Sequence, residues 1–205
     1  MARLLLATNN KAKVREYRSL LKGISFKLVT LAEQGIKTTV DEVGESLEEN
    51  ASLKAVAAAA EGKLLALADD SGLEVDILGG EPGRLSARYA GEGASDEERV
   101  NYLLLRLEGV PEEERSAHFR CVIAIATPQG GVKLCSGQCR GFITFKPRGR
   151  EGFGYDPVFY LPELGKTMAE LPLEIKNKVS HRGQAARKAR QVLERLKVNK
   201  EGASK

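Results

Sequence analysis

Short apolar runs alternate with helical patterns along the first half of the chain. Three of these runs are compact enough for buried strands: residues 4–8, 26–31 and 64–68. Between the first two runs, apolar positions recur at helical spacing in residues 11–22. An alanine-rich segment precedes the third run, and Ser46 with Glu49 forms a capping box where that segment begins. The pattern predicts strands and helices in alternation, which is typical of α/β proteins.

The second half adds two further helices and a pair of long strands. A second capping box, Ser95 with Glu98, opens a helix that ends near residue 107. Two strand-like runs, residues 117–127 and 132–145, are separated by a glycine-containing turn, so we expect a hairpin. Residues 184–197 carry the apolar stripe of an amphipathic helix.

These elements predict an α/β fold with a mixed, twisted sheet, helices on its faces and a cleft. No linker-like composition interrupts the pattern, so we expect a single domain over residues 1–198 and a flexible tail at residues 199–205. No stretch approaches the roughly 20 apolar residues of a membrane span. The first apolar run is also too short for a signal peptide, so we expect a cytoplasmic protein without a membrane partner.

The cysteines and the charges narrow the picture further. Cys121, Cys135 and Cys139 form no Cys-x-x-Cys pair, and their odd number favours reduced thiols packed in strands. The net charge is only +4, but residues 41–50 hold five acids and no base, whereas residues 176–197 hold eight basic residues and one acid. A basic helix is commonly a solvated face. The alternative is a partner rich in phosphate, either a nucleic acid or a nucleotide.

The sequence Asp69-Asp70-Ser71-Gly72 follows directly after the third apolar run. Carboxylates at the end of a buried strand supply the hard oxygen ligands that suit Mg²⁺. Asp-Ser-Gly is also common turn chemistry, and the tetrapeptide alone does not separate the two interpretations.

A second candidate site follows the first predicted strand, at the start of a helix. Free backbone N–H groups and the helix dipole favour an anion at such a position. The residues there add hydroxyl, amide and ammonium donors: Thr8, Asn9, Asn10, Lys11, Ala12 and Lys13. The alternative is an Asn N-cap followed by surface lysines. The end of a strand in an open α/β sheet is where ligands bind, which favours the first interpretation.

Two further segments could recognise a base. Phe153, Gly154, Tyr155 and Asp156 place two aromatic rings between glycines, and an exposed ring can stack on a base. The alternative is that both rings are buried in the core. His181 and Arg182 lie just before the last predicted helix, five or six residues after Lys176.

Taken together, these blocks resemble the Ham1-type family of inosine/xanthosine triphosphate pyrophosphatases. The resemblance covers nearly the whole chain, with blocks in family order: LLLATNNKAK from residue 4, GESLEENASLKA from 44, ADDSG from 68, GGEPGRLSARYAG from 79, FRCV from 119, EGFGYDPVF from 151, KTMAEL from 166 and SHRG from 180. Each block is weak alone, but eight in order are specific. The resemblance implies two lobes around a central substrate cleft, and a homodimer.

The resemblance also implies roles for individual residues. Asp70 would be the general base and a Mg²⁺ ligand, and Asp41 or Glu42 would be a second metal ligand. The triphosphate and substrate contacts would come from residues 8–13, Lys54 and Ser71. Residues 153–156 would hold the base and sugar, while Lys176, His181 and Arg182 read the base edge.

The implied reaction is hydrolysis of ITP, dITP or XTP to the monophosphate and pyrophosphate. We expect the attacking water to be either bound to the metal ion or activated by Asp70. The sequence departs from the family pattern at Asp41, where a Glu is usual, at Asn9-Asn10, where a Gly is frequent, and at residues 174–177. A pyrophosphatase of broader or pyrimidine specificity is the first alternative. A nucleic-acid-binding protein that uses the basic helix ranks lower, because it leaves Asp70, Asp41 and Glu42 without a role.

Overall fold

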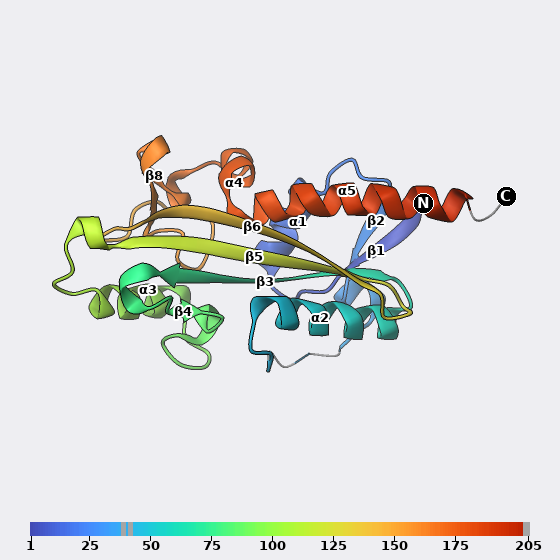
Figure 1. Ribbon diagram of the computed structural model, residues 1–205, viewed down its shortest axis with the longest axis horizontal. Coiled ribbons are helices and arrows are strands. Elements are labelled where there is room, and N and C mark those ends of the chain that lie inside the picture. The colour runs from blue at the N-terminus through green and yellow to red at the C-terminus, as the bar shows by residue number, and fades with distance from the viewer. Residues whose placement is uncertain (38–39, 41–42, 203–205) are drawn as a thin grey trace. The chain divides into compact units, whose positions relative to one another are not determined.

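The computed structural model describes residues 1–37, 40 and 43–202. It contains the predicted alternation of strands and helices (Figure 1). The strands are β1 Ala2–Leu6, β2 Phe26–Thr30, β3 Leu65–Val75, β4 Pro82–Gly83, β5 Ser116–Ala126, β6 Val132–Ile143, β7 Phe159–Leu161 and β8 Lys166–Thr167. The helices are α1 Lys11–Leu20, α2 Leu47–Gly62, α3 Asp96–Arg106, α4 Leu173–Val179 and α5 His181–Gly202. Short 3-10 turns occupy Ala32–Gln34, Asp76–Leu78, Ser86–Arg88, Glu112–Glu114, Pro162–Leu164 and Met168–Glu170.

The strands of the described residues form a mixed sheet, as predicted. The hydrogen-bonded order is β2-β1-β3-β5-β6-β7-β8, with β4 on β3. β1 pairs in parallel with β2 and β3, whereas β3–β4, β6–β7 and β7–β8 are antiparallel. By contacts between residues, the chain divides into two compact units. The first comprises residues 1–70, 121–137 and 182 onward, and the second comprises residues 71–120 and 138–181.

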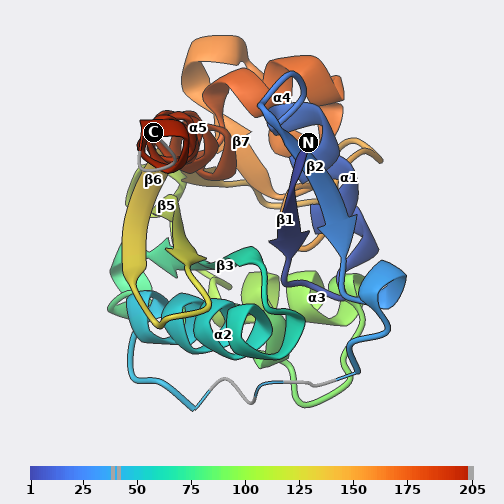
Figure 2. The same ribbon diagram turned by 90° about the vertical axis from the view of Figure 1, so that its right-hand side faces the viewer.

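In the first unit, helices cover both faces of the strands. Alternate side chains of a strand point to opposite faces, and this separates Leu4 and Leu6 from Leu5. Leu4 and Leu6 pack with side chains of α1 and α5, including Tyr17 and Ala189. Leu5 packs on the opposite face with the alanines of α2. Figure 2 shows α2 on one side of these strands and α1 and α5 on the other.

The second unit has its own apolar core, into which α3 packs. Val100 and Leu103 of the helix belong to the same buried apolar cluster as Leu73, Phe119 and Phe159 from the strands. The Ser95–Glu98 capping box predicted for this helix is confirmed: Ser95 Oγ accepts from the Glu98 amide, and the Glu98 carboxylate accepts from the Ser95 amide. The three cysteines are free and buried, in agreement with their predicted role in packing.

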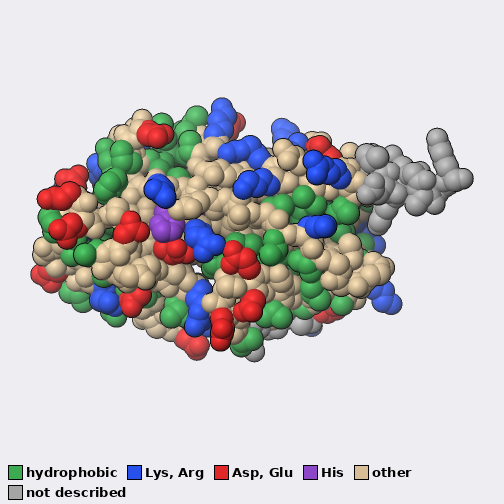
Figure 3. Space-filling view, viewed as in Figure 1, with side chains coloured by type: hydrophobic (Ala, Val, Ile, Leu, Met, Phe, Trp, Pro, Cys, Tyr) green, Lys and Arg blue, Asp and Glu red, His purple; other side chains and the backbone are tan. Residues whose placement is uncertain are grey.

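The basic side chains of α5 are in part engaged by the protein itself. Lys and Arg side chains gather over this helix on the face seen in Figure 3. Lys188 donates to the carbonyl of Ser136 at 2.7 Å, and Arg190 donates to the carbonyls of Leu20 and Lys22. These contacts favour the structural interpretation of the basic helix over a nucleic-acid surface. Across the described part of the chain, none of the helices has the length and apolarity needed to cross a membrane.

The buried side chain of Arg115 links four backbone carbonyls of the second unit, so its replacement should lower the stability of the protein. The side chain is only 2% exposed, and its guanidinium donates to the carbonyls of Leu107, Val110, Ile143 and Thr144. We expect Arg115→Met to lower the free energy of unfolding by about 1–3 kcal/mol, because several buried carbonyls lose their donor.

Urea denaturation measures this loss as a lower midpoint. Arg140→Met is the matched control, because Arg140 is an exposed residue of β6; we expect it to stay within about 0.5 kcal/mol of wild type. Equal midpoints for the two variants would contradict the role assigned to Arg115.

Candidate active site

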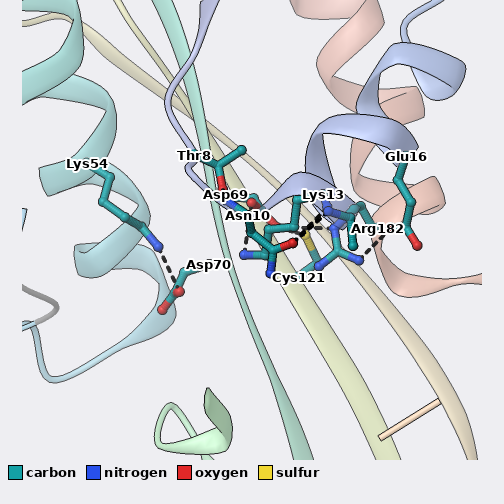
Figure 4. A network of polar contacts seen from close by, with 10 residues as sticks. Thr8, Asn10, Lys13, Glu16, Lys54, Asp69, Asp70, Cys121 and Arg182 are labelled. Carbon is teal, nitrogen blue, oxygen red and sulfur yellow. Dashed lines mark hydrogen bonds and ion pairs between the residues drawn. The ribbon is translucent and has the colours of Figure 1, made fainter. Parts of the chain in front are cut away.

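Asp69 and Asp70 lie inside a strand, not in a turn after one. β3 continues through them to Val75, so the expected end of the strand near residue 68 is wrong. Because side chains alternate along a strand, adjacent residues face opposite sides of the sheet. Leu67 packs on the face of the sheet that α1 and α5 cover, and Ala68 packs on the face that α2 covers. By the same alternation, Asp69 lies on the α1 and α5 face and Asp70 lies on the α2 face. The two carboxylates therefore belong to separate clusters (Figure 4).

Asp70 is paired with Lys54 of α2. The Lys54 Nζ lies 2.9 Å from Asp70 Oδ1, and both side chains are largely buried. The helix that carries Lys54 begins as predicted, with Ser46 Oγ accepting from the amide of Glu49. Asn50, one turn before Lys54, is buried and accepts from the Gly44 amide at 2.9 Å. Asn50 and Lys54 therefore both lie on an inward face of α2.

Asp69 belongs to a buried ionic network on the opposite face. Its side chain is fully buried, with Oδ1 at 3.1 Å from Lys13 Nζ and Oδ2 at 3.2 Å from Arg182 Nε. Arg182 also donates to Glu16 Oε2 at 2.8 Å. Burial alone would raise the pKa of Asp69, but Lys13 and Arg182 outweigh it and hold that pKa well below its ordinary value. Asp69 is therefore a fixed anion that orients two cations.

The same carboxylate suppresses the acidity of its uncharged neighbours. Cys121 Sγ lies 3.8 Å from Asp69 Oδ2. Burial, together with the Asp69 charge, raises the pKa of Cys121 to about 12, and the same two causes raise the pKa of Tyr17. A thiol that stays protonated is a poor nucleophile, so Cys121 serves packing here.

The turn between β1 and α1 places the predicted phosphate-binding residues beside this network. β1 and β3 run parallel with Leu6 opposite Leu67, and the Ala7 amide donates to the Leu67 carbonyl. The end of β1 therefore lies beside the Asp pair, which is inside β3. Thr8 is half-buried, whereas Asn9 and Lys11 are exposed.

One expectation about this turn requires correction. We expected the first amides of α1 to be available to an anion, but the Asn10 side chain accepts from the amides of Ala12 and Lys13, at 2.9 and 3.1 Å. The Asn N-cap interpretation is thus confirmed for these two amides. Those two amides are therefore engaged within the protein, and the Lys13 side chain is oriented by Asp69.

In the second unit, Asp156 organises residues 152–156, which we call the aromatic loop. Asp156 Oδ2 is 2.5 Å from Lys176 Nζ and accepts from the Phe153 amide at 2.9 Å. Lys176 comes from α4, a helix that the sequence analysis missed, and its ammonium lies 5.0 Å from the centre of the Phe153 ring. The structure therefore brings three predicted site residues together: Phe153, Asp156 and Lys176.

The two aromatic rings of the loop have different environments. Tyr155 is 3% exposed and packs in the core of the second unit, and its hydroxyl donates to the Ser86 carbonyl at 2.9 Å. The expectation that Tyr155 offers an exposed face for stacking is wrong. Phe153 is only half-buried, so it is the ring of this loop that can stack on a base.

His181 and Arg182 form the first turn of α5, which starts three residues earlier than predicted. His181 is buried and stacks on Phe119, with ring centres 4.6 Å apart. Arg182 belongs to the first unit, where it is buried against Asp69 and Glu16. That Arg182 reads the base edge stays a prediction. Its contacts indicate a positioning role for Lys13 and the β1–α1 turn.

The sequence analysis missed Glu16 as a member of the site. A possible signal was present, because Glu16 lies on α1 three residues after Lys13 and beside Tyr17, on the face that is otherwise apolar. A single acid on an inward face indicates a buried partner. The partner itself, Arg182, lies too far along the chain for any local pattern to reveal.

The predicted metal ligands are only partly described. Asp41 and Glu42 lie outside the described residues. Among the residues that are described, no group of three His, Cys, Asp or Glu side chains could hold a metal ion. Asp70 supplies hard carboxylate oxygen, and Mg²⁺ is commonly bound by one or two carboxylates together with substrate phosphates. The donor chemistry at Asp70 therefore fits a Mg²⁺ ion that a polyphosphate substrate helps to hold.

The fold agrees with the family that the sequence resembles. The chain belongs to the Ham1 family, whose family model matches residues 4–192. It is 51% identical over 199 residues to the dITP/XTP pyrophosphatase of Desulforamulus reducens, covering 97% of this chain and 99% of that protein. The dITP/XTP pyrophosphatase of Geobacter sulfurreducens is 54% identical over 185 residues, covering 90% of this chain and 93% of that protein.

Solved structures agree with this assignment. A HAM1 protein from Coxiella burnetii matches with a TM-score of 0.86 at 42% identity, over 94% of this chain and 98% of that one. The Ham1 protein of Staphylococcus aureus matches with a TM-score of 0.83 at 41% identity, over 94% and 98%. The predicted family and the predicted mixed α/β fold are both confirmed.

Gly152 offers a direct test of the aromatic loop. Its φ is +78°, and a Cβ there would clash with the Asp156 carboxylate and lie 3.1 Å from Lys176 Nζ. Gly154 has φ +63° with open space at the same position. We expect Gly154→Ala to cost about 1–2 kcal/mol of unfolding free energy through backbone strain alone. Gly152→Ala should cost clearly more, because it adds the clash. Thermal or urea unfolding compares the two, and equal losses would contradict the packing described here.

Proposed function

We propose that this protein hydrolyses deaminated purine nucleoside triphosphates, ITP, dITP and XTP, to the monophosphate and pyrophosphate in the presence of Mg²⁺. The observation that carries the proposal is that Asp69 and Asp70 face opposite sides of the sheet and pair with different cations. Asp70 faces Lys54, Asp69 fixes Lys13 and Arg182, and the β1–α1 turn lies beside both. The two relatives described above are dITP/XTP pyrophosphatases that match over nearly their whole length, and they support the same reaction.

In the proposed reaction, Asp70 accepts a proton from the attacking water. Lys54, at 2.9 Å, orients the Asp70 carboxylate and adds positive charge next to the phosphates. The water attacks the α-phosphorus, the bond from that phosphorus to the bridging oxygen breaks, and pyrophosphate leaves. Lys13 and the exposed Lys11 stabilise the negative charge that moves onto the leaving group. No side chain acts as a covalent nucleophile in this scheme.

Asp70 would hold the proposed Mg²⁺ ion, and Asp41 or Glu42 would supply a second carboxylate. When bound, the ion neutralises phosphate charge and increases the acidity of a water that it coordinates. Mg²⁺ dependence is part of the proposal and is tested with it.

Base selection is assigned to the aromatic loop, Lys176 and His181. Phe153 stacks on the purine, which is worth about 1–3 kcal/mol and tolerates different bases. Lys176 and His181 are proposed to recognise the 6-oxo group. Hypoxanthine and xanthine present an acceptor there and adenine a donor, so donors at this position reject adenine. We further propose a cytoplasmic homodimer, as the family resemblance implies.

Incubation of the purified protein with dITP, ITP, XTP, dATP, dGTP and dCTP, with and without Mg²⁺, tests the proposal. We expect pyrophosphate release from the first three, at least about a hundredfold faster than from dATP or dCTP, and only when Mg²⁺ is present. Equal release from dATP or dCTP would support the broader pyrophosphatase instead. Binding of dITP without pyrophosphate release would refute the enzymatic function.

A further inference from the structure

We propose that Asp96 of α3 is a positioning residue that fixes the aromatic loop and so sets how Phe153 meets the base. This inference rests on the proposed function for its consequence in catalysis, but not for its structural basis. Asp96 Oδ2 accepts from the Gly154 amide at 2.6 Å, across 58 residues of sequence. Gly154 directly follows Phe153 in the loop.

The usual reason for an acid at the start of a helix does not account for this contact. Acids there complement the helix dipole. In α3, the Ser95–Glu98 capping box already satisfies the helix start on its own. Glu97 and Glu98 add two more negative charges in the first turn. Asp96 therefore adds little that is needed for the helix, yet it is the residue of this turn that reaches the aromatic loop.

Arg99 orients the Asp96 carboxylate. It forms an ion pair with Asp96 Oδ1, the oxygen that does not contact Gly154. Arg99 in turn donates to the carbonyls of Ala87 at 2.9 Å and Ala94 at 2.5 Å. Because two carbonyls hold the Arg99 guanidinium in place, the paired Asp96 carboxylate has few orientations available. In the observed orientation, its Oδ2 points to the Gly154 amide.

The contact fixes a particular peptide plane. The peptide unit between Phe153 and Gly154 carries the Phe153 carbonyl and the Gly154 N–H. The N–H is held by Asp96, and the carbonyl accepts from the Asp156 amide at 3.3 Å. Gly154 has φ +63°, so without these bonds a glycine could rotate the plane freely. Holding the plane at both ends restricts the backbone of Phe153, and with it the direction of the ring.

Asp96→Ala and Asp96→Asn test the inference together, with Glu97→Ala as the matched control on the exposed side of the same turn. We expect Asp96→Ala to raise the KM for dITP about tenfold, with a smaller change in kcat, because misplacement of a positioning group weakens the bound geometry. Asn keeps an oxygen that can accept from Gly154, so Asp96→Asn should recover part of the loss. Glu97→Ala should match wild type.

A second readout does not depend on activity. In ¹⁵N spectra, we expect the Gly154 amide of Asp96→Ala to exchange with solvent faster than in wild type, while amides of β5 stay protected. An unchanged Gly154 amide, or a KM equal to that of Glu97→Ala, would overturn the inference. Wild-type protein that releases no pyrophosphate from dITP would overturn the proposed function instead, and the exchange of Gly154 would still decide the role of Asp96.

Discussion

Asp70→Asn should reduce kcat for dITP by about a hundred- to ten-thousandfold, the contribution typical of a general base. Asn has nearly the size of Asp and keeps one oxygen toward Lys54, so the packing around β3 is retained. What the variant loses is the charge that accepts a proton from water. Because Lys13, Lys54 and the aromatic loop are unchanged, nucleotide binding should remain measurable.

Two measurements separate the expected loss of turnover from the retained nucleotide binding. Pyrophosphate release gives kcat, and calorimetry with dITP gives the dissociation constant. Asp76→Asn is the control, because the Asp76 side chain lies on the same chain segment six residues later and is 57% exposed; it should behave as wild type. Near-normal turnover by Asp70→Asn would remove Asp70 from the reaction, and with it the central assignment of the proposed function.

Features that depend on neighbouring residues were predictable from the sequence. The N-cap patterns at Ser46 and Ser95 are local, and α2 and α3 begin where they indicate. The full capping box is confirmed at Ser95, whereas at Ser46 the Glu49 carboxylate accepts from the Glu45 amide instead of the Ser46 amide. The hairpin of β5 and β6 follows from two apolar runs and a glycine turn, and Thr127 and Gly131 close it by a backbone bond. That Asp70 comes directly after an apolar run that forms part of a buried strand was also visible in the local sequence.

The errors share a physical cause, which is contact between residues distant in sequence. Adjacent acids after an apolar run look like the end of a strand, since a lone buried carboxylate is costly. β3 continues because cations from elsewhere in the chain compensate Asp69: Lys13 from α1 and Arg182 from α5. Tyr155 is buried because the Ser86 carbonyl, 69 residues away, accepts its hydroxyl. No local pattern carries that information.

Arg182→Met should be the most destabilising of the substitutions considered, with a loss of about 3–5 kcal/mol in unfolding free energy. Met fills similar space, but it leaves the carboxylates of Asp69 and Glu16 in the interior with one cation fewer. Arg195→Met, at an exposed position of α5, should change stability by no more than about 0.5 kcal/mol. If the charge left on Glu16 causes much of the loss, adding Glu16→Gln to Arg182→Met should recover part of it.

The pH dependence of the loss identifies its electrostatic origin. Lys13 and Arg182 hold the pKa of Asp69 well below its ordinary value, so in wild type this carboxylate contributes stability above the unfolded pKa, about 4, and loses it only in stronger acid. Without Arg182 the pKa of Asp69 should rise, and the variant can then relieve its buried charge by taking up a proton as the pH falls. The gap in unfolding free energy between wild type and Arg182→Met should therefore be wider at pH 7 than at pH 4. A gap independent of pH would mean that Arg182 contributes through packing alone, and the buried network would lose its role in orienting Lys13.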